Sequence, residues 1–196
     1  MRRIATGDRR QETRKSIRFC LVACCLSLVA ASKQAPPAGF SGFQPAGGHP
    51  VTAELITEHA SIQPGGQTKV GVHFDLEEGW HIYAQEPGDA GLPTTITWNA
   101  PEEATIGPLQ WPKPHEFLAA GDIHTFGYAG TVVLSSTMTL VQGTKSDAIP
   151  LRAKVAWLAC KDICVPGSAN LEMTLPVTAN PPAFSTHAQF FEQIEE

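Results

Sequence analysis

The sequence predicts an all-β, immunoglobulin-like β-sandwich with long loops at one end and a short C-terminal helix. Two observations predict this fold. Several short segments alternate apolar and polar residues with a period of two, which is typical of half-buried strands. Clusters of Gly and Pro separate these segments too often for any long helix to form. Seven or so short strands divided in this way are typical of a two-sheet sandwich.

The first 31 residues are predicted to be a secretory signal peptide rather than part of the fold. Residues 1–18 carry seven Lys or Arg, residues 19–31 carry no charge, and small residues follow. This apolar run is too short to cross about 30 Å of hydrocarbon as a helix, so we expect no stable membrane span. The run ending at Cys24 also has the form of a bacterial lipobox, so a lipid anchor at Cys24 is an alternative. Either way, the predicted location is the periplasm.

Removing this segment makes the remaining chain strongly acidic. The full chain has 14 Lys and Arg against 19 Asp and Glu; residues 32–196 keep 7 and 17, so the formal charge changes from −5 to −10. A nucleic-acid partner requires a basic face that neutralises phosphates, and this composition excludes one. Only two cysteines remain, and in an oxidising compartment such a pair is usually joined.

The elements follow in order along the chain. Residues 32–50 are rich in Pro, Gly and Ala and are predicted to form a flexible leader, and residues 51–180 are predicted to form the domain. The strand-like segments include residues 70–76, 94–98, 131–141, 149–158 and 170–175, and the turn-forming clusters lie at 64–66, 87–88, 91–93, 112–114 and Gly143.

Two regions depart from the strand pattern. Residues 101–130 are the least regular, and we expect long loops there, which are more often functional than idle. Residues 181–196 form a C-terminal tail with a predicted short helix over 185–196. Ser185 is the candidate cap of this helix, and Phe190, Phe191 and Ile194 form its apolar side.

Cys160 and Cys164 are the chemically capable pair. With three residues between them, their sulfurs can meet only if the backbone turns tightly, because bonded cysteines hold their Cα atoms within about 7 Å. A disulfide that closes so short a loop stabilises the fold by only about 2 kcal/mol. The spacing therefore favours redox use over reinforcement.

Several motifs together resemble those of one protein family. They are Gly79-Trp80-His81-Ile82-Tyr83, the run at 87–93, Leu109-Gln110-Trp111-Pro112, Phe126-Gly127-Tyr128 and the run at 157–167 that holds the cysteines. The sequence resembles the N-terminal periplasmic domain of DsbD-type thiol:disulfide interchange proteins, including the branch associated with copper-tolerance operons.

The resemblance implies an immunoglobulin-like domain that exchanges electrons between a transmembrane thiol reductase and thioredoxin-fold periplasmic proteins. It implies that Cys160 and Cys164 are the redox pair and that Cys164 forms the mixed disulfide with a client. The family also places aromatic side chains beside its disulfide, at the positions of His81 and Tyr83.

The same family shields its disulfide with a cap loop that bears a phenylalanine. The corresponding run here is His115-Glu116-Phe117, which makes Phe117 the expected cap. His115 stands where well-studied members carry an aspartate, so acid–base help from that position is in doubt. The cysteines are also more closely spaced than in those members, so the local loop must differ.

Two other readings of the cysteines stay open. In the first, the chain is a non-catalytic docking module with a structural disulfide. In the second, it handles Cu(I) through the two sulfurs, with His81, His115 or His124 assisting. Residues 1–196 hold no transmembrane or thioredoxin-like domain, so we expect the reductant to be a separate protein. We expect a monomeric electron carrier of the thiol–disulfide oxidoreductase kind, with no cofactor and no resident metal.

Overall fold

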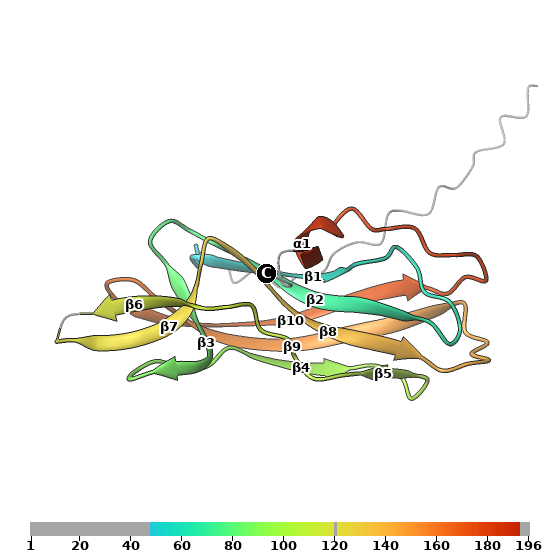
Figure 1. Cartoon of the computed structure of the whole chain (residues 1–196), viewed down its shortest axis with the longest axis horizontal. Coiled ribbons are helices and arrows are strands. Elements are labelled where there is room, and N and C mark those ends of the chain that lie inside the picture. Colours follow the sequence, from blue (N-terminus) through green and yellow to red (C-terminus); the bar gives the residue numbers. More distant parts are fainter. Residues whose placement is uncertain (1–47, 120, 193–196) are drawn as a thin grey trace, which may run out of the picture. The chain divides into compact units, whose positions relative to one another are not determined.

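Two antiparallel sheets enclose the hydrophobic core in the computed structural model, which describes residues 48–119 and 121–192 (Figure 1). The all-β, immunoglobulin-like sandwich predicted from the sequence is confirmed. The predicted signal peptide, nearly all of the predicted leader, and Ile194 lie outside the described residues. Within the described residues, no helix has the length and apolar character needed to cross a membrane.

The smaller sheet has four strands. Their order across the sheet is β1 (Val51–Thr57), β2 (Gln67–Leu76), β8 (Thr131–Leu140) and β5 (Ala104–Ile106). The larger sheet has six strands. Five of them follow the order β10 (Cys164–Pro176), β9 (Ala148–Cys160), β3 (His81–Gly88), β7 (Ile123–Ala129) and β6 (His115–Ala119), and β4 (Thr95–Asn99) also pairs with β9.

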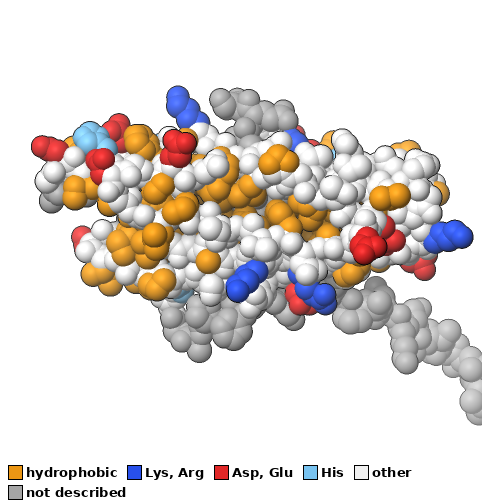
Figure 2. Space-filling view, turned by 90° about the horizontal axis from the view of Figure 1, so that it is seen from below, with side chains coloured by type: hydrophobic (Ala, Val, Ile, Leu, Met, Phe, Trp, Pro, Cys, Tyr) orange, Lys and Arg blue, Asp and Glu red, His pale blue; other side chains and the backbone are white. Residues whose placement is uncertain are grey.

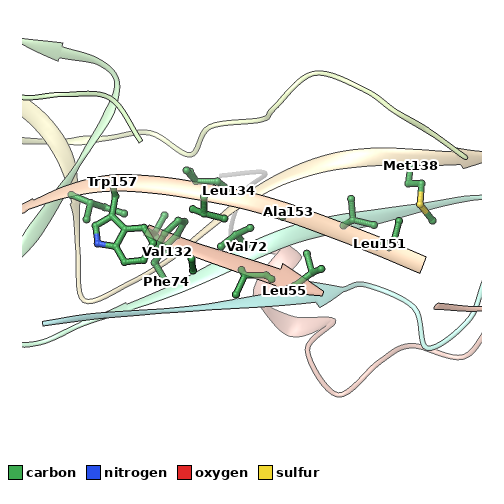
Figure 3. Packing of buried hydrophobic residues seen from close by; sticks show 14 of the residues in the cluster. Leu55, Val72, Phe74, Val132, Leu134, Met138, Leu151, Ala153 and Trp157 are labelled. Carbon is green, nitrogen blue, oxygen red and sulfur yellow. The ribbon is translucent and has the colours of Figure 1, made fainter. Parts of the chain in front are cut away.

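The core is built from the period-two pattern of the strands. In β2, Val70, Val72 and Phe74 are fully buried, and in β9 the odd-numbered residues from Ile149 to Ala159 point inward. Figure 3 shows Phe74, Val72 and Leu55 of the smaller sheet opposite Trp157 and Leu151 of the larger one. Alternating side chains from the two inner faces thus form one continuous core.

The even-numbered residues of β9 point to the outer face of the larger sheet. Along most of the strand this face is exposed, as at Arg152, Lys154 and Ala156. Arg152 pairs across the strands with Glu172 of β10, with 2.9 Å between Nε and Oε1, and both side chains remain more than half exposed. Cys160 is also an even-numbered residue of β9, so its side chain belongs to this outer face.

Residues 101–130 are more ordered than the sequence predicts, since they contain β5, β6 and β7. The irregular part is the connection at 107–114, which is fixed by hydrogen bonds rather than by apolar periodicity. The Tyr128 hydroxyl donates to the Pro112 carbonyl at 2.8 Å, and the backbone N–H of Gln110 donates to the Ser135 carbonyl at 2.6 Å.

Gly127 allows β3 and β7 to approach each other closely. A Cβ atom at this position would lie 2.1 Å from the carbonyl oxygen of Ile82, which is backbone and cannot turn away. The pairing of Tyr83 with Gly127 therefore depends on glycine. This contact explains the glycine in the Phe126-Gly127-Tyr128 motif.

The C-terminal segment, defined here as residues 177–192, packs on the outer face of the smaller sheet. Its helix, α1 (Gln189–Glu192), is shorter than the predicted span of 185–196. Phe191 is 1% exposed and packs against Ile56 and Val133. Ser185 bonds to the backbone at the end of β1: its N–H donates to the Glu58 carbonyl at 2.9 Å and its hydroxyl donates to the Thr57 carbonyl.

Candidate functional site

Cys160 and Cys164 form a disulfide at the end of the β9–β10 hairpin. Cys160 is the last residue of β9 and Cys164 the first of β10, and the two are direct cross-strand partners with Cα atoms 4.1 Å apart. The turn between them is closed by a 3.0 Å hydrogen bond from the N–H of Lys161 to the carbonyl of Ile163. The tight turn that the spacing requires is therefore present.

The two sulfur-bearing residues differ sharply in exposure. Cys164 is exposed, whereas Cys160 is only 3% exposed. Both belong to the outer face of the larger sheet, where the preceding even-numbered residues of β9 face solvent. Burial of Cys160 therefore requires a cover on this face, and an attacking thiolate can reach Cys164 more easily than Cys160.

His81 lies beside Cys160 on the neighbouring strand. The two residues are direct partners between β3 and β9, so their side chains share one face. The His81 ring stacks on Phe117, with ring centres 4.4 Å apart, and meets the edge of Tyr83 at 5.2 Å. Its Nε2 atom is buried without a hydrogen-bond partner, and burial lowers the pKa of His81 below 6.5.

Phe117 reaches this face from the β6–β7 hairpin. It pairs with Thr125 of β7, whose hydroxyl donates to the Phe117 carbonyl at 3.3 Å. The Phe117 side chain is half-buried and lies over His81. The strand of His81, β3, is the neighbour of the strand that carries Cys160. The structure thus brings Phe117 to the neighbourhood of the disulfide, and its role as a cap stays a prediction.

Tyr83 lies on the same outer face and is 5% exposed. A Cβ atom at Gly91 would lie 2.3 Å from the Tyr83 ring, and Gly91 has φ +105°. The Thr94 hydroxyl donates to the Tyr83 carbonyl at 3.0 Å. The run at 87–93 therefore wraps around Tyr83, and burial there raises the pKa of its hydroxyl.

His115 and Glu116 occupy opposite faces of the β6–β7 hairpin. His115 pairs with Gly127, which pairs with Tyr83, so it shares the face of the disulfide but is itself exposed. Glu116 alternates to the other face, where its Oε1 lies 2.5 Å from Nδ1 of His124. The structure therefore does not bring Glu116 to the disulfide.

The Glu116–His124 contact is part of a link that sequence reasoning missed. The backbone N–H of His124 donates to Oδ2 of Asp89 at 2.9 Å, and the N–H of Asp89 donates to the His124 carbonyl at 2.9 Å. This link joins the hairpin to the loop after β3. The run at 87–93 contains Asp89, but local spacing does not reveal a partner 35 residues away.

Lys161 is directed away from the sulfurs. Its Nζ donates to the Glu78 carbonyl at 3.1 Å, and its aliphatic stem packs over Gly79. The lysine therefore ties the disulfide turn to the connection before β3. Asp162 is exposed beside it.

Exposed apolar side chains lie at the disulfide end of the sandwich. Leu92, Leu118, Ile123 and Ile163 are 63%, 66%, 37% and 67% exposed, respectively. They come from the loop after β3, the β6–β7 hairpin and the disulfide turn. Figure 2 shows hydrophobic side chains on the surface at the end of the molecule that carries β6 and β7. In the described part of the chain, no group of three or more His, Cys, Asp or Glu side chains is arranged to hold a metal ion.

Comparisons with known proteins give consistent results. A profile of the family described as thiol:disulfide interchange protein DsbD, N-terminal, matches residues 52–176. No curated protein matches the sequence. Among solved structures, the N-terminal periplasmic domain of ScsB from Proteus mirabilis is similar, with a TM-score of 0.58 and 22% identity over 79% of this chain. The chain spans 57% of the length of that structure.

Two further structures come from Neisseria meningitidis. The reduced DsbD N-terminal domain has a TM-score of 0.38 and 16% identity, with 67% of this chain and 90% of that chain covered. A complex between the DsbD N-terminal domain and the PilB N-terminal domain has a TM-score of 0.37 and 11% identity, with 67% of this chain and 88% of that chain covered.

Proposed function

Because the chain belongs to the family of DsbD N-terminal domains, we propose that it relays electrons between a membrane thiol reductase and periplasmic client proteins through the Cys160–Cys164 disulfide. The observation that carries this proposal is the unequal exposure of the two cysteines. Cys164 is open to an attacking thiolate, whereas Cys160 is buried beside His81.

This arrangement suits a two-step exchange. A partner thiolate attacks the sulfur of Cys164, a mixed disulfide forms, and Cys160 leaves as a thiolate. A second partner thiol then attacks the mixed disulfide, so the domain becomes fully reduced. In the reverse direction, Cys164 attacks a client disulfide and Cys160 resolves the intermediate. The proposed clients are thioredoxin-fold proteins, and the apolar side chains around the disulfide are suited to contact them.

Trapping of the mixed disulfide tests the proposal. The Cys160→Ala variant leaves Cys164 as a single thiol with no neighbour on its own chain to resolve it. Incubation with an oxidised thioredoxin-fold protein, followed by a rapid quench that alkylates the partner's freed second thiol, is therefore expected to capture a covalent complex. The Cys164→Ala variant is the matched control, because its remaining thiol is at the buried position. Complexes that form equally well with both variants, or with neither, would contradict the proposal.

A permanently structural bridge makes the opposite prediction for the wild-type protein. On that view, reduced thioredoxin-fold partners leave the Cys160–Cys164 bond intact, and the two alanine variants lose stability without gaining any covalent reactivity. Counting free thiols by alkylation and mass spectrometry after incubation with a reduced partner distinguishes the two views.

A further inference from the structure

Resolution of a mixed disulfide by Cys160 requires the loss of a proton at a buried position. This inference rests on the proposed function, in which Cys164 bonds to the client and Cys160 then attacks. The nucleophile in such a step is the thiolate, whose formation from an ordinary thiol requires a pH near 8.5. At 3% exposure, Cys160 has little access to the water that would otherwise accept its proton.

His81 is placed to accept that proton. It is the direct cross-strand partner of Cys160, and the Cβ atoms of such pairs lie about 5 Å apart on one face of the sheet. Its Nε2 atom is buried and has no hydrogen-bond partner. The imidazole is held by ring contacts with Phe117 and Tyr83 rather than by polar bonds, so its nitrogen stays free to accept a hydrogen.

Among the described residues, no other side chain on this face has the same combination of properties. Tyr83 is buried, and its raised pKa keeps its hydroxyl protonated. His115 is exposed and lies two strands away from β3, across Gly127. The amine of Lys161 donates to the Glu78 carbonyl, and Asp162 is exposed in the turn.

Of the other charged groups of the β6–β7 hairpin, Asp122 is exposed in the turn, and Glu116 and His124 face away from the disulfide. Glu116 and His124 contact each other on the opposite face of the hairpin. Burial, the cause that lowers the pKa of His81, keeps the imidazole neutral at pH 7 and therefore able to act as a base.

We propose that His81 is the general base that deprotonates Cys160 during resolution of the mixed disulfide. The proton on Cys160 Sγ moves to Nε2 of His81, and the resulting thiolate attacks Cys164 Sγ. The Cys160–Cys164 bond forms, the bond between Cys164 and the client breaks, and the client leaves as a thiolate. The cysteine pair is oxidised, the client disulfide is reduced, and the imidazolium returns its proton to the departing thiolate or to water.

Attack by Cys164 and resolution by Cys160 can be followed separately, because each step releases one coloured nitrothiobenzoate from a disulfide reagent. Reduced protein is mixed with dithiobis(nitrobenzoate) in a stopped-flow instrument. Attack by Cys164 on the reagent releases the first nitrothiobenzoate, and resolution by Cys160 releases the second. The His81→Phe variant keeps an aromatic ring against Phe117 and Tyr83 but removes the base. We expect the second release to slow by about 10²-fold at pH 7, with the first release unchanged.

The His73→Phe variant is the matched control. His73 is also a histidine whose Nε2 is buried without a partner and whose ring contacts a phenylalanine, at an interplanar angle of 42°, but it lies on β2, under the C-terminal segment. Both releases are expected to keep wild-type rates in this variant. Circular dichroism establishes that each variant is folded before its rates are compared.

The pH profile provides the readout that a purely structural role would not change. In the wild-type protein, the rate of the second release is expected to fall as pH drops through the pKa of His81, below 6.5. In His81→Phe it should instead rise with pH through the ordinary thiol range, near 8.5. A second release that His81→Phe leaves unchanged overturns the inference. Equal slowing of both releases also overturns it, because that result indicates a change in the cover over the site. If the wild-type protein releases no chromophore, the proposed function fails and the inference fails with it.

Discussion

Two histidines in this protein have nearly the same surroundings but lie on opposite outer faces of the sandwich. The His73 ring meets Phe190 at a tilt, with ring centres 4.6 Å apart, and the His81 ring stacks on Phe117 at 4.4 Å. Both Nε2 atoms are buried without hydrogen-bond partners, and burial is the largest cause that lowers both pKa values. Each histidine is therefore covered by a segment that is not part of the central strands.

The two covers are attached in different ways. Phe191 of the C-terminal segment is 1% exposed, and the backbone of Ser185 and Ala183 is hydrogen-bonded to Glu58 and Ala60, just after β1. Phe117, by contrast, is half-buried and reaches His81 only by ring stacking. Phe117 lies on β6, which pairs only with β7 among the described strands. The side chains of Leu118 and Ile123 in this hairpin are exposed.

The difference shows which cover can move at low cost. Displacing the C-terminal segment would expose a large buried aromatic side chain and break backbone hydrogen bonds. Turning the Phe117 side chain away from His81 would expose its half-buried ring and the imidazole beneath it, but the phenyl ring itself makes no hydrogen bond to break. Of the two covers, the one over His81, the cross-strand partner of Cys160, is therefore the weaker.

The largest effect on stability is expected at Phe191. Phe191→Ala removes a fully buried ring and should lower the free energy of unfolding by about 3–5 kcal/mol, as measured by urea denaturation. The matched control is Phe184→Ala in the same segment, because Phe184 is 72% exposed and its loss should cost about 0.5 kcal/mol. Equal losses for the two variants would show that the C-terminal segment is not anchored by burial.

A somewhat smaller effect is expected at Gly127, which sets the spacing of β3 and β7 beside the site. Gly127→Ala places a Cβ against the Ile82 carbonyl, so the strands must separate, and the free energy of unfolding should fall by about 1–3 kcal/mol. Gly107→Ala is the control, because its Cβ would meet only the Thr137 carbonyl at 3.4 Å. A variant at Gly127 as stable as the control would contradict the close approach of these strands.

Phe117→Ala is expected to affect reactivity more than stability. Loss of a half-buried ring should cost about 1 kcal/mol, whereas reduction of the disulfide by dithiothreitol should accelerate because the cover over His81 is removed. Leu118→Ala is the matched control on the other face of the same strand, where the side chain is 66% exposed. Unchanged reduction rates in Phe117→Ala would show that this ring does not shield the disulfide.

The smallest expected effect is the pH dependence of stability due to His73 and His81. In the unfolded chain a histidine titrates near 6.5, whereas burial lowers both folded pKa values. As pH falls below 6.5, the unfolded chain binds protons first, so stability is complete above 6.5 and declines towards the folded pKa values. Urea denaturation at about pH 7 and about pH 5 should show a smaller decline for His73→Phe and for His81→Phe than for the wild-type protein. A decline equal to that of the wild type would contradict burial of the neutral ring.

Local patterns predicted much of the fold, because alternation reports which side of a strand faces the core. Residues 70–76 and 149–158 lie within β2 and β9 as expected. The β6 strand was missed because it is short, follows two prolines and carries His115 and Glu116 where apolar residues would mark a strand. Its order comes from pairing with β7, which is a tertiary contact.

The site was predictable in its residues but not in its arrangement. The resemblance to the family of DsbD N-terminal domains implied that Phe117 and His81 lie near Cys160 and Cys164. Alternation along β9, however, assigns Cys160 to the exposed face, and nothing local indicates that it is buried. Its register with His81 joins segments almost 80 residues apart, which periodicity within either segment does not encode.

The most direct test of the account is the redox equilibrium of the Cys160–Cys164 pair in glutathione buffers. Protein equilibrated across a range of reduced-to-oxidised glutathione ratios is quenched by alkylation, and its free thiols are counted by mass spectrometry. A redox-active pair should show a reversible two-thiol transition with a midpoint above about −300 mV, where exchange with cellular thiol systems is possible. A bond that remains closed down to about −300 mV would contradict the proposed function and would make the disulfide a structural one.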